Sequence, residues 1–307
     1  MTHAYTLFHV LLALTASPLL LSIINRVKAF FGGRSGPPLL QPYYDLFKLL
    51  RKGAVYSRTT SWVFRAGPVV GLAAALTALL LVPLGEIPAL AAFPGDLLLM
   101  AYTLGLMRFF TVVAALDTGS AFEGMGASRE VQFSALTEVA LLTGLAAVSA
   151  KVHAVSLSTL SSQVWARGPA WEDSATVLLA SGALLVVLLA ENARIPFDDP
   201  NTHLELTMIH EVMILDAGGV DLALFEYAAA IKFWVLGALL VSIALPLRTT
   251  VPALNLALGL GAMLILGVVV GCIESIMARL RLVRVPQLIV AAGVLSLLAV
   301  IMAVRLI

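Results

Sequence analysis

Residues 190–226 read AENARIPFDDPNTHLELTMIHEVMILDAGGVDLALFE and separate two apolar runs, 177–189 and 227–245. This stretch holds eight of the 18 acidic residues of the chain and two of its five histidines, although only 12% of all residues are charged. Ionisable residues placed among membrane spans are energetically costly and usually serve a function. The stretch therefore predicts a polar region between two spans, in which the function of the chain concentrates.

The composition of the whole chain is that of a membrane protein. Hydrophobic residues make up 60% of its 307 positions and its mean hydropathy is +0.99, whereas soluble domains are about half apolar and about one quarter charged. Apolar runs of about 20 residues recur, which is the length that crosses a bilayer as a helix. The short alternating segments of a membrane β-barrel do not occur. We expect a single all-α polytopic membrane domain over residues 1–307.

The apolar runs predict eight transmembrane helices and a topology. The expected spans are roughly 4–25, 66–84, 96–116, 133–152, 174–191, 227–246, 253–274 and 286–305. Of the 19 basic residues, 13 fall in the connections on one side of these spans and four on the other. The positive-inside rule then places the long loops 26–65, 117–132 and 192–226 in the cytoplasm and both termini outside.

The first long loop contains an expected amphipathic helix. After the turn at Gly36-Pro37-Pro38, apolar side chains recur at the spacing of one helix face, at Tyr43, Leu46, Phe47 and Leu50. Charged residues lie between them, as in a helix that rests on the membrane surface or against a partner. A solvated loop helix with a basic face is the alternative.

Several ionisable residues fall within or at the edge of the expected spans: Arg108, Asp117, Glu138, Glu191, Glu226, Lys232 and Glu274. Exposure of these groups to lipid would cost a few kcal/mol each, so we expect them to face the interior of the bundle. They could form a proton relay or polar cavity. The alternative is structural ion pairing, of Arg108 with a carboxylate and of Lys232 with Glu226.

Other kinds of chemistry find little support. On a helix, His203 and His210 would lie about 10.5 Å apart, too far to share one zinc ion. Titratable histidines in a loop near acids are better interpreted as pH-responsive structural or proton-transfer groups. Cys272 is the only cysteine, so the chain can form neither an internal disulfide nor a four-cysteine iron–sulfur site. The net charge of +1 gives no basic bias toward nucleic acid. We therefore expect no cofactor or metal on this chain.

Four loop segments resemble one family. In order they are GRSGPPLLQPYYDLFKLL (33–50), GASREVQFSALTEVALL (126–142), ENARIPFDDPNTHLEL (191–206) and IESIMARLRLVRVPQ (273–287). They resemble the subunit-1 (H-type) membrane protein of complex I and its counterparts in group 4 membrane-bound [NiFe] hydrogenases. Asn201 and His203 stand where quinone-reducing relatives carry acids, so the chain is most similar to the formate hydrogenlyase subunit 4 and hydrogenase-4 component C type.

The resemblance implies a membrane-anchor subunit without a catalytic site of its own. It would dock a peripheral redox arm and couple its electron transfer to proton or Na⁺ translocation in a bacterial or archaeal cytoplasmic membrane. The implied partners are hydrogenase-like large and small subunits, an Fe–S subunit and antiporter-like membrane subunits, which would carry the [NiFe] centre and Fe–S clusters.

The resemblance also directs the choice of candidate residues. The expected ion path comprises Arg108, Asp117, Glu138, Glu191, Arg194, Asp198, Glu205, Glu211 and Lys232. The expected docking loops comprise Gly36, Pro37, Gln41, Pro42, Asp45, Lys48, Arg129, Glu130, Pro196 and Phe197. Two other functions stay open: a quinone-reducing complex, in which the same loops would shape a quinone chamber, and a stand-alone secondary transporter, for which no internal repeat is found.

Overall fold

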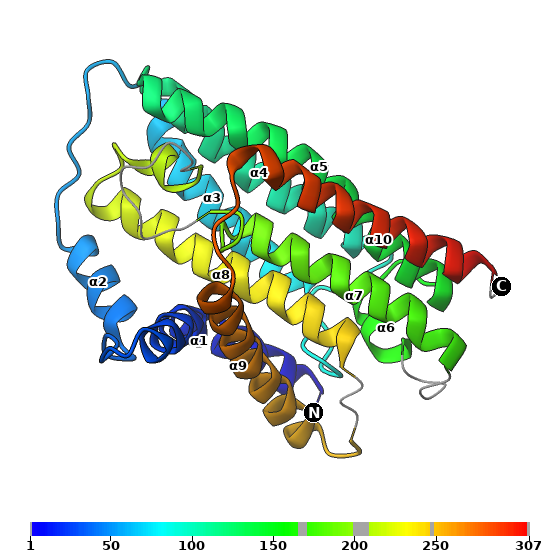
Figure 1. The fold of residues 1–307 in the computed structure, drawn as a ribbon. Coiled ribbons are helices and arrows are strands. Elements are labelled where there is room, and N and C mark those ends of the chain that lie inside the picture. The colour runs from blue at the N-terminus through cyan, green and yellow to red at the C-terminus, as the bar shows by residue number, and fades with distance from the viewer. Residues whose placement is uncertain (1, 165–170, 199–208, 246–248, 306–307) are drawn as a thin grey trace.

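The computed structural model describes residues 2–164, 171–198, 209–245 and 249–305 of the chain. Within them the elements are α-helices and two short 3₁₀ helices (Figure 1). In chain order these are α1 (Thr2–Phe31), α2 (Gln41–Leu50), α3 (Trp62–Leu81), α4 (Asp96–Asp117), α5 (Ala121–Val152), α6 (Leu157–Gln163), α7 (Trp171–Glu191), η1 (Glu211–Ile214), α8 (Gly219–Ala244), α9 (Pro252–Ile276), η2 (Leu282–Arg284) and α10 (Val285–Arg305).

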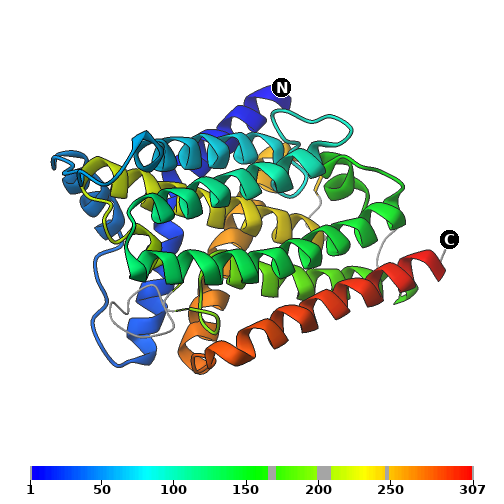
Figure 2. The same cartoon turned by 90° about the horizontal axis from the view of Figure 1, so that it is seen from above.

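Eight of these helices are long and apolar enough to cross a membrane: α1, α3, α4, α5, α7, α8, α9 and α10. The predicted all-α polytopic fold is therefore confirmed. Successive spans run in opposite directions, so that both termini lie at one end of the bundle (Figures 1 and 2). The other end, which we call the α2 end, is made by α2 and by the connecting residues 32–61, 118–120, 192–198, 209–218 and 277–284.

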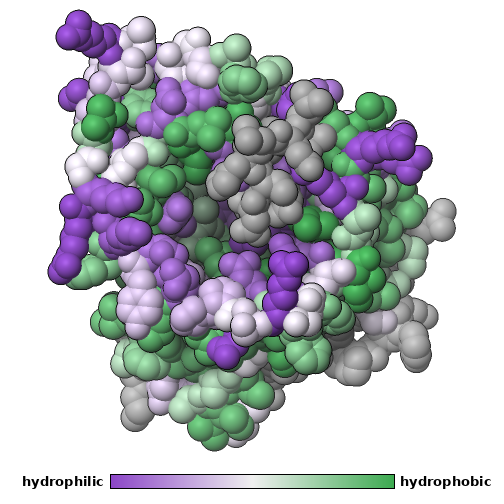
Figure 3. Space-filling view, turned by 60° about the vertical axis from the view of Figure 1, so that its left-hand side comes forward, coloured by the Kyte–Doolittle hydropathy of each residue, from purple (hydrophilic) through white to green (hydrophobic). Residues whose placement is uncertain are grey.

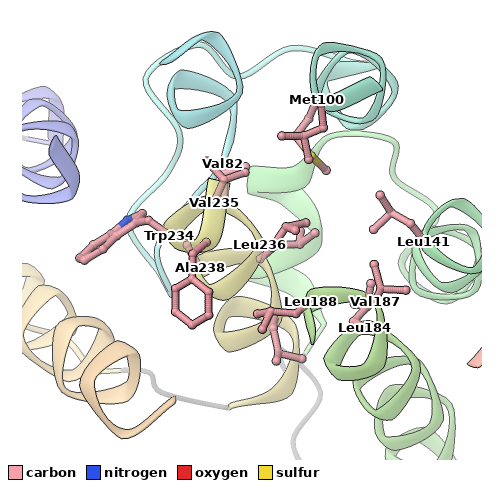
Figure 4. Packing of buried hydrophobic residues seen from close by; sticks show 14 of the residues in the cluster. Val82, Met100, Leu141, Leu184, Val187, Leu188, Trp234, Val235, Leu236 and Ala238 are labelled. Carbon is pink, nitrogen blue, oxygen red and sulfur yellow. The ribbon is translucent and has the colours of Figure 1, made fainter. Parts of the chain in front are cut away.

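Helix α8 lies at the centre of the bundle. In its most apolar 18-residue window 83% of the residues are buried, against 56% or less in the other spans. It packs against α1, α2, α3, α7 and α9. Figure 4 shows Leu236 of α8 near Leu188 of α7, whereas Trp234 points to the other side of α8. A helix that is apolar on all sides is typical of such a central position, and Lys232 in its middle is only 5% exposed.

Helix α2 confirms that an amphipathic helix follows the first span, but its apolar residues divide between two faces. Tyr43 donates a hydrogen bond to the carbonyl of Thr15 on α1, and Leu46 lines a cavity beside α1. Phe47 is 57% exposed and its ring lies 4.0 Å from the guanidinium of Arg51. One side of α2 is thus held by the bundle, while the other side is open.

The loops are shorter than predicted, because the helices extend beyond the apolar runs. Helix α1 continues to Phe31 and α8 begins at Gly219, which shortens the loops expected at 26–65 and 192–226. The expected loop 117–132 is largely wrong, since α5 begins at Ala121. Glycines favour a loop locally, yet each costs only about 1 kcal/mol inside a helix. Packing of η1 against this first part of α5 offsets that cost.

Candidate functional site

Arg108 of α4 is the centre of a buried charge network. Its Nη2 lies 2.6 Å from Oε1 of Glu191 on α7. On α5, Glu130 lies 3.7 Å from its Nε and Glu138 lies 3.6 Å from its Nη1. One guanidinium therefore contacts carboxylates from two other spans, which fixes α4, α5 and α7 relative to one another.

The central helix supplies the second cation of this network. Nζ of Lys232 lies 3.1 Å from Oε2 of Glu191, and the two side chains are only 5% and 4% exposed. Lys232 lies about 20 Å along the helix axis from Gly219, where α8 begins. The network thus reaches deep into the membrane-spanning part of the bundle.

The network contains three carboxylates and two cations: Glu130, Glu138, Glu191, Arg108 and Lys232. Buried ion pairs gain little net stability over apolar packing, because desolvation offsets most of the attraction. Within membrane spans, such groups typically mark paths for protons or ions. Because the carboxylates outnumber the cations by one, the network is suited to hold an additional proton or cation.

A second charged cluster lies at the α2 end, around the ENARIPFDD motif. Glu274 of α9 lies 2.9 Å from Nζ of Lys28 on α1 and 3.5 Å from Nη1 of Arg194. Asp198 lies 3.5 Å from Nη2 of Arg279. These contacts attach the start of the 192–198 segment to the ends of α1 and α9.

Asp198 also binds the segment that begins at Ile209. Its Oδ2 accepts hydrogen bonds from the backbone N–H of Ile209 at 2.8 Å and of His210 at 3.3 Å. On the other side, a Cβ added to Gly126 of α5 would lie 2.9 Å from the carbonyl oxygen of Ile209. The segment 209–214 is therefore held between Asp198 and a close contact with α5.

A cavity of about 240 Å³ lies beside this segment. Its walls come from α1, α2, α4, α8, the 192–198 segment and η1. Most of the lining is apolar, and the polar side chains in it are Thr111, Asn192, Arg194, Asp198, His210, Glu211 and Glu226. Hydrophilic side chains gather on this end of the molecule (Figure 3). An apolar chamber with a few convergent polar groups is typical of a ligand site.

His210 belongs to both the cavity and the network. It lines the cavity, and its Nδ1 lies 3.9 Å from Oε2 of Glu130. A second, smaller cavity of about 20 Å³ is lined by Glu130, Glu191 and Asp198. This volume is sufficient for about one water molecule. The network therefore adjoins the large cavity through His210, and the small cavity lies between the network and Asp198.

The structure brings together some of the predicted path residues and separates others. Arg108, Glu138, Glu191 and Lys232 meet in the network, whereas Arg194 and Asp198 lie in the second cluster and Glu211 in the cavity wall. Asp117 is apart from all of them, because its carboxylate caps α3 by accepting hydrogen bonds from the N–H groups of Ser61 and Phe64 at 2.7 and 3.3 Å. Glu205 and His203 lie outside the described residues.

The expected pairing of Lys232 with Glu226 is wrong within the described residues, because Lys232 contacts Glu191 of α7 instead. The general expectation that Arg108 pairs with a carboxylate is confirmed. The partner of Lys232 lies on another helix, and the local spacing along α8 therefore gives no indication of it.

The expected docking residues have different environments. Pro37, Asp45 and Lys48 are exposed at the α2 end, Gln41 donates a hydrogen bond to Asp45 at 2.9 Å, and Pro42 lines the cavity. Gly36 packs closely against Ala29 of α1, and Arg129 is half-buried on α5.

Three of the expected docking residues require correction. Phe197 is buried in the hydrophobic core, and Pro196 is buried while its carbonyl accepts a hydrogen bond from the N–H of Leu280. Glu130 lies in the charge network. The turn that these motif residues form folds into the protein, so their side chains are not presented at its surface.

The sequence interpretation misses several residues of the site. Lys28 and Arg279 are not among its path or docking candidates, and neither is Glu123, which is fully buried and bonds to Thr118 and to the N–H of Asp216. His210 is interpreted as a possible proton-transfer group but is not placed on the path. Glu274 is identified only as a charge in a span, without a partner. The sequence signal that could have identified these residues is an acidic or basic residue near the end of an apolar run. Among the described residues, no group of three or more His, Cys, Asp or Glu side chains is arranged to hold a metal ion.

Comparisons with known proteins agree with this architecture. Residues 4–305 match the protein family described as NADH dehydrogenase. Formate hydrogenlyase subunit 4 of Escherichia coli is 30% identical over 296 residues, covering 94% of each chain. Hydrogenase-4 component C of the same organism is 31% identical over 242 residues, covering 79% of this chain and 75% of that protein.

A solved structure has the same fold. A chain in the structure of the membrane-bound sulfane sulfur reductase, an archaeal respiratory membrane complex, superposes with a TM-score of 0.82 at 22% sequence identity. The match covers 98% of this chain and 99% of that chain. At this identity the comparison concerns the fold alone.

Proposed function

Since this chain belongs to the NADH dehydrogenase family and is the membrane subunit of a complex I-like, hydrogenase-type respiratory complex, we propose that it couples electron transfer in its partner subunits to the movement of protons or Na⁺. The chain itself would perform no redox chemistry. Its part is to anchor the redox subunits and to supply a buried polar path.

The charge network is the observation that carries this proposal. Arg108, Glu191 and Lys232 are largely buried in three different spans, and the carboxylate of Glu191 lies within 3.1 Å of both cations. Such an arrangement contributes little net stability, so a structural role alone accounts poorly for it. Carboxylates that share too few cations can take up and release protons as the charge around them changes.

The α2 end is the proposed cytoplasmic side and the docking surface for the redox subunits. The basic connections lie at this end, as the positive-inside rule requires of the cytoplasmic face. Its exposed groups include Pro37, Asp45 and Lys48. A redox event in a docked subunit would act on the cavity, which adjoins the network through His210.

The proposed partners follow from the relatives named formate hydrogenlyase subunit 4 and hydrogenase-4 component C. They are hydrogenase-like large and small subunits with a [NiFe] centre, an Fe–S subunit and antiporter-like membrane subunits. In this assembly the present chain would connect the redox arm to the ion-translocating membrane arm.

A quinone site is the second candidate function, and the cavity beside α1 and α2 favours it. A chamber of about 240 Å³ with mainly apolar walls and polar groups at one end is the kind of site that binds an amphipathic ring compound. The H-type component of the NADH-quinone oxidoreductase of Anaplasma phagocytophilum is 31% identical over 227 residues. In this case the parent complex would reduce quinone instead of forming or consuming hydrogen.

Purification of the tagged protein from native membranes in mild detergent tests the proposal. Nickel, iron and hydrogenase activity in the eluate are the expected result. A nickel-free complex that reduces quinone would support the second function, and a lone protein that transports a solute in liposomes would contradict both.

The coupling function needs a separate variant. Glu191→Gln removes a carboxylate charge at the centre of the network and is expected to abolish ion movement while electron transfer continues in uncoupled vesicles. Glu86→Gln, in the 82–95 connection at the opposite end, is the matched control. Equal ion movement per electron in both variants would contradict a role for the network.

A further inference from the structure

We propose that His210 is the proton-transfer group that connects the cavity at the α2 end to the buried charge network, by exchanging a proton with Glu130. This inference rests on the proposed coupling function and deepens it. It assigns the transfer step to one side chain that the resemblance does not single out.

The position of His210 carries the inference. It lines the 240 Å³ cavity and also lies within 4 Å of a network carboxylate, with Nδ1 at 3.9 Å from Oε2 of Glu130. Its side chain is 28% exposed and that of Glu130 is 13% exposed. The imidazole therefore stands between a chamber that water can enter and carboxylates that are largely removed from water.

The backbone around His210 is fixed, so the imidazole is held at this junction. The backbone N–H of His210 donates a hydrogen bond to Oδ2 of Asp198, and the backbone N–H of Ile209 donates to the same oxygen. Met213, in the same segment, packs into a cluster with Val112, Ala115 and Ala127. A group that transfers protons must stay within reach of both donor and acceptor, and these contacts provide that constraint.

The charges around His210 are suitable for exchange. On the network side the charged groups are Glu130 and, behind it, Arg108. The charged groups that line the cavity with His210 are Arg194 and Asp198 of the 192–198 segment, Glu211 beside it and Glu226 of α8. Acids from several elements therefore lie around the same cavity and can serve as proton donors or acceptors. Glu130 shares the guanidinium of Arg108 with two other carboxylates, so it can accept a proton without leaving Arg108 unpaired.

The proposed step conserves atoms and charge. The Nδ1–H bond of the imidazolium breaks and an O–H bond forms at Oε2 of Glu130, leaving a neutral imidazole and a neutral carboxylic acid. Nε2 still carries its own hydrogen, so the bare Nδ1 is the atom that then takes up a proton from the cavity, by way of water or a rotation of the ring, which restores the imidazolium. The distance of 3.9 Å exceeds a direct hydrogen bond of about 3 Å, so a small side-chain rotation or one bridging water completes the contact.

Vesicles that contain the complete complex provide the test. Electron transfer is followed with a viologen dye in the presence of an uncoupler, and proton movement with a pH-sensitive dye inside sealed vesicles. In His210→Ala and His210→Gln we expect unchanged electron transfer and about a tenfold or greater fall in protons moved per electron, because a positioned proton-transfer group contributes roughly 100-fold or more to the rate. His153→Asn is the control, since His153 is exposed at the opposite end and has a φ of 56°, which asparagine tolerates.

Rescue distinguishes proton transfer from positioning. Free imidazole can enter the cavity enlarged by His210→Ala, and we expect it to restore proton movement in that variant while leaving the wild type unchanged. Full proton movement in His210→Ala or His210→Gln would overturn the inference and favour the route through the smaller cavity. Loss without rescue would also overturn it, in favour of a positioning role. A wild-type complex that transfers electrons without moving protons would instead refute the proposed function itself.

Discussion

Replacing Lys232 by methionine tests whether the network is an energetically coupled unit. The ammonium lies 3.1 Å from Glu191 and both side chains are at most 5% exposed. Removing one partner of a buried ion pair costs about 3–5 kcal/mol, because the remaining charge is left buried. Arg108 still contacts the other oxygen of Glu191 at 2.6 Å, so we expect a loss near the lower limit, about 3 kcal/mol.

The double variant Lys232→Met with Glu191→Gln gives the decisive number. It removes both charges, and it should be less destabilised than the sum of the two single variants by about 1–3 kcal/mol, the coupling expected of side chains in direct contact. The free energy of unfolding can be measured by titration with sodium dodecyl sulfate in mixed micelles. The fluorescence of Trp234, which is buried two residues further along α8, reports the transition.

A matched surface change sets the baseline for this measurement. Lys48→Met, on the exposed side of α2, should alter the free energy of unfolding by no more than about 0.5 kcal/mol. If the single variants of Lys232 and Glu191 are additive within about 0.5 kcal/mol, the two side chains are not coupled and the reasoning from their contact is refuted.

Three further predictions concern packing and capping. Gly126→Ala should lower the free energy of unfolding by about 1–3 kcal/mol through overpacking, because its Cβ would lie 2.9 Å from the carbonyl oxygen of Ile209. A Cβ at Gly124 would have no atom within 4 Å, so its control Gly124→Ala should stabilise the protein by roughly 0.5–1 kcal/mol. Gly219→Ala should destabilise the folded protein, since the φ of Gly219 is +56° and its Cβ would lie 2.7 Å from the carbonyl oxygen of Gly53. Gly218→Ala is the control for this variant. Thermal unfolding of both pairs of variants checks the sign of each effect. Asp117→Ala should lower stability by about 1 kcal/mol as the loss of a helix cap, yet Asp117→Asn should leave ion movement per electron unchanged, and a loss of coupling in Asp117→Asn would restore Asp117 to the path.

The membrane fold can be predicted well from the sequence, because span length and apolar composition are local properties. The eight spans, the amphipathic helix after the first span and the charged residues within spans all follow from patterns of about 20 residues or fewer. Loop boundaries are predicted less accurately. The first turns of α5 contain two glycines and charged residues, and their helical form depends on packing against η1, which is distant in sequence.

The site can be predicted as a set of residue types, without its pairings. Glu191, Arg108 and Lys232 are all identified as candidates, but the spacing along one helix suggests Glu226 as the partner of Lys232. Asp117 is an acidic residue at the edge of a span, as expected of a path residue, but its hydrogen bonds are those of a helix cap. From the sequence His210 is interpreted as a pH-responsive or proton-transfer group, but without a partner, because only the folded chain places its imidazole against Glu130, which is distant in sequence.

The length of α5 has a consequence for where the charges lie in the bilayer. Its 32 residues extend about 48 Å, while the hydrocarbon core is about 30 Å thick. Tilt alone would have to reach about 50°, beyond the roughly 40° seen for membrane helices. Part of α5 must therefore project past the hydrocarbon core, and the charged residues Glu123 and Arg129 indicate that it is the first turns. Glu130 and Glu138 are about 12 Å apart along the axis, so Arg108 joins one carboxylate near the membrane boundary to another well below it.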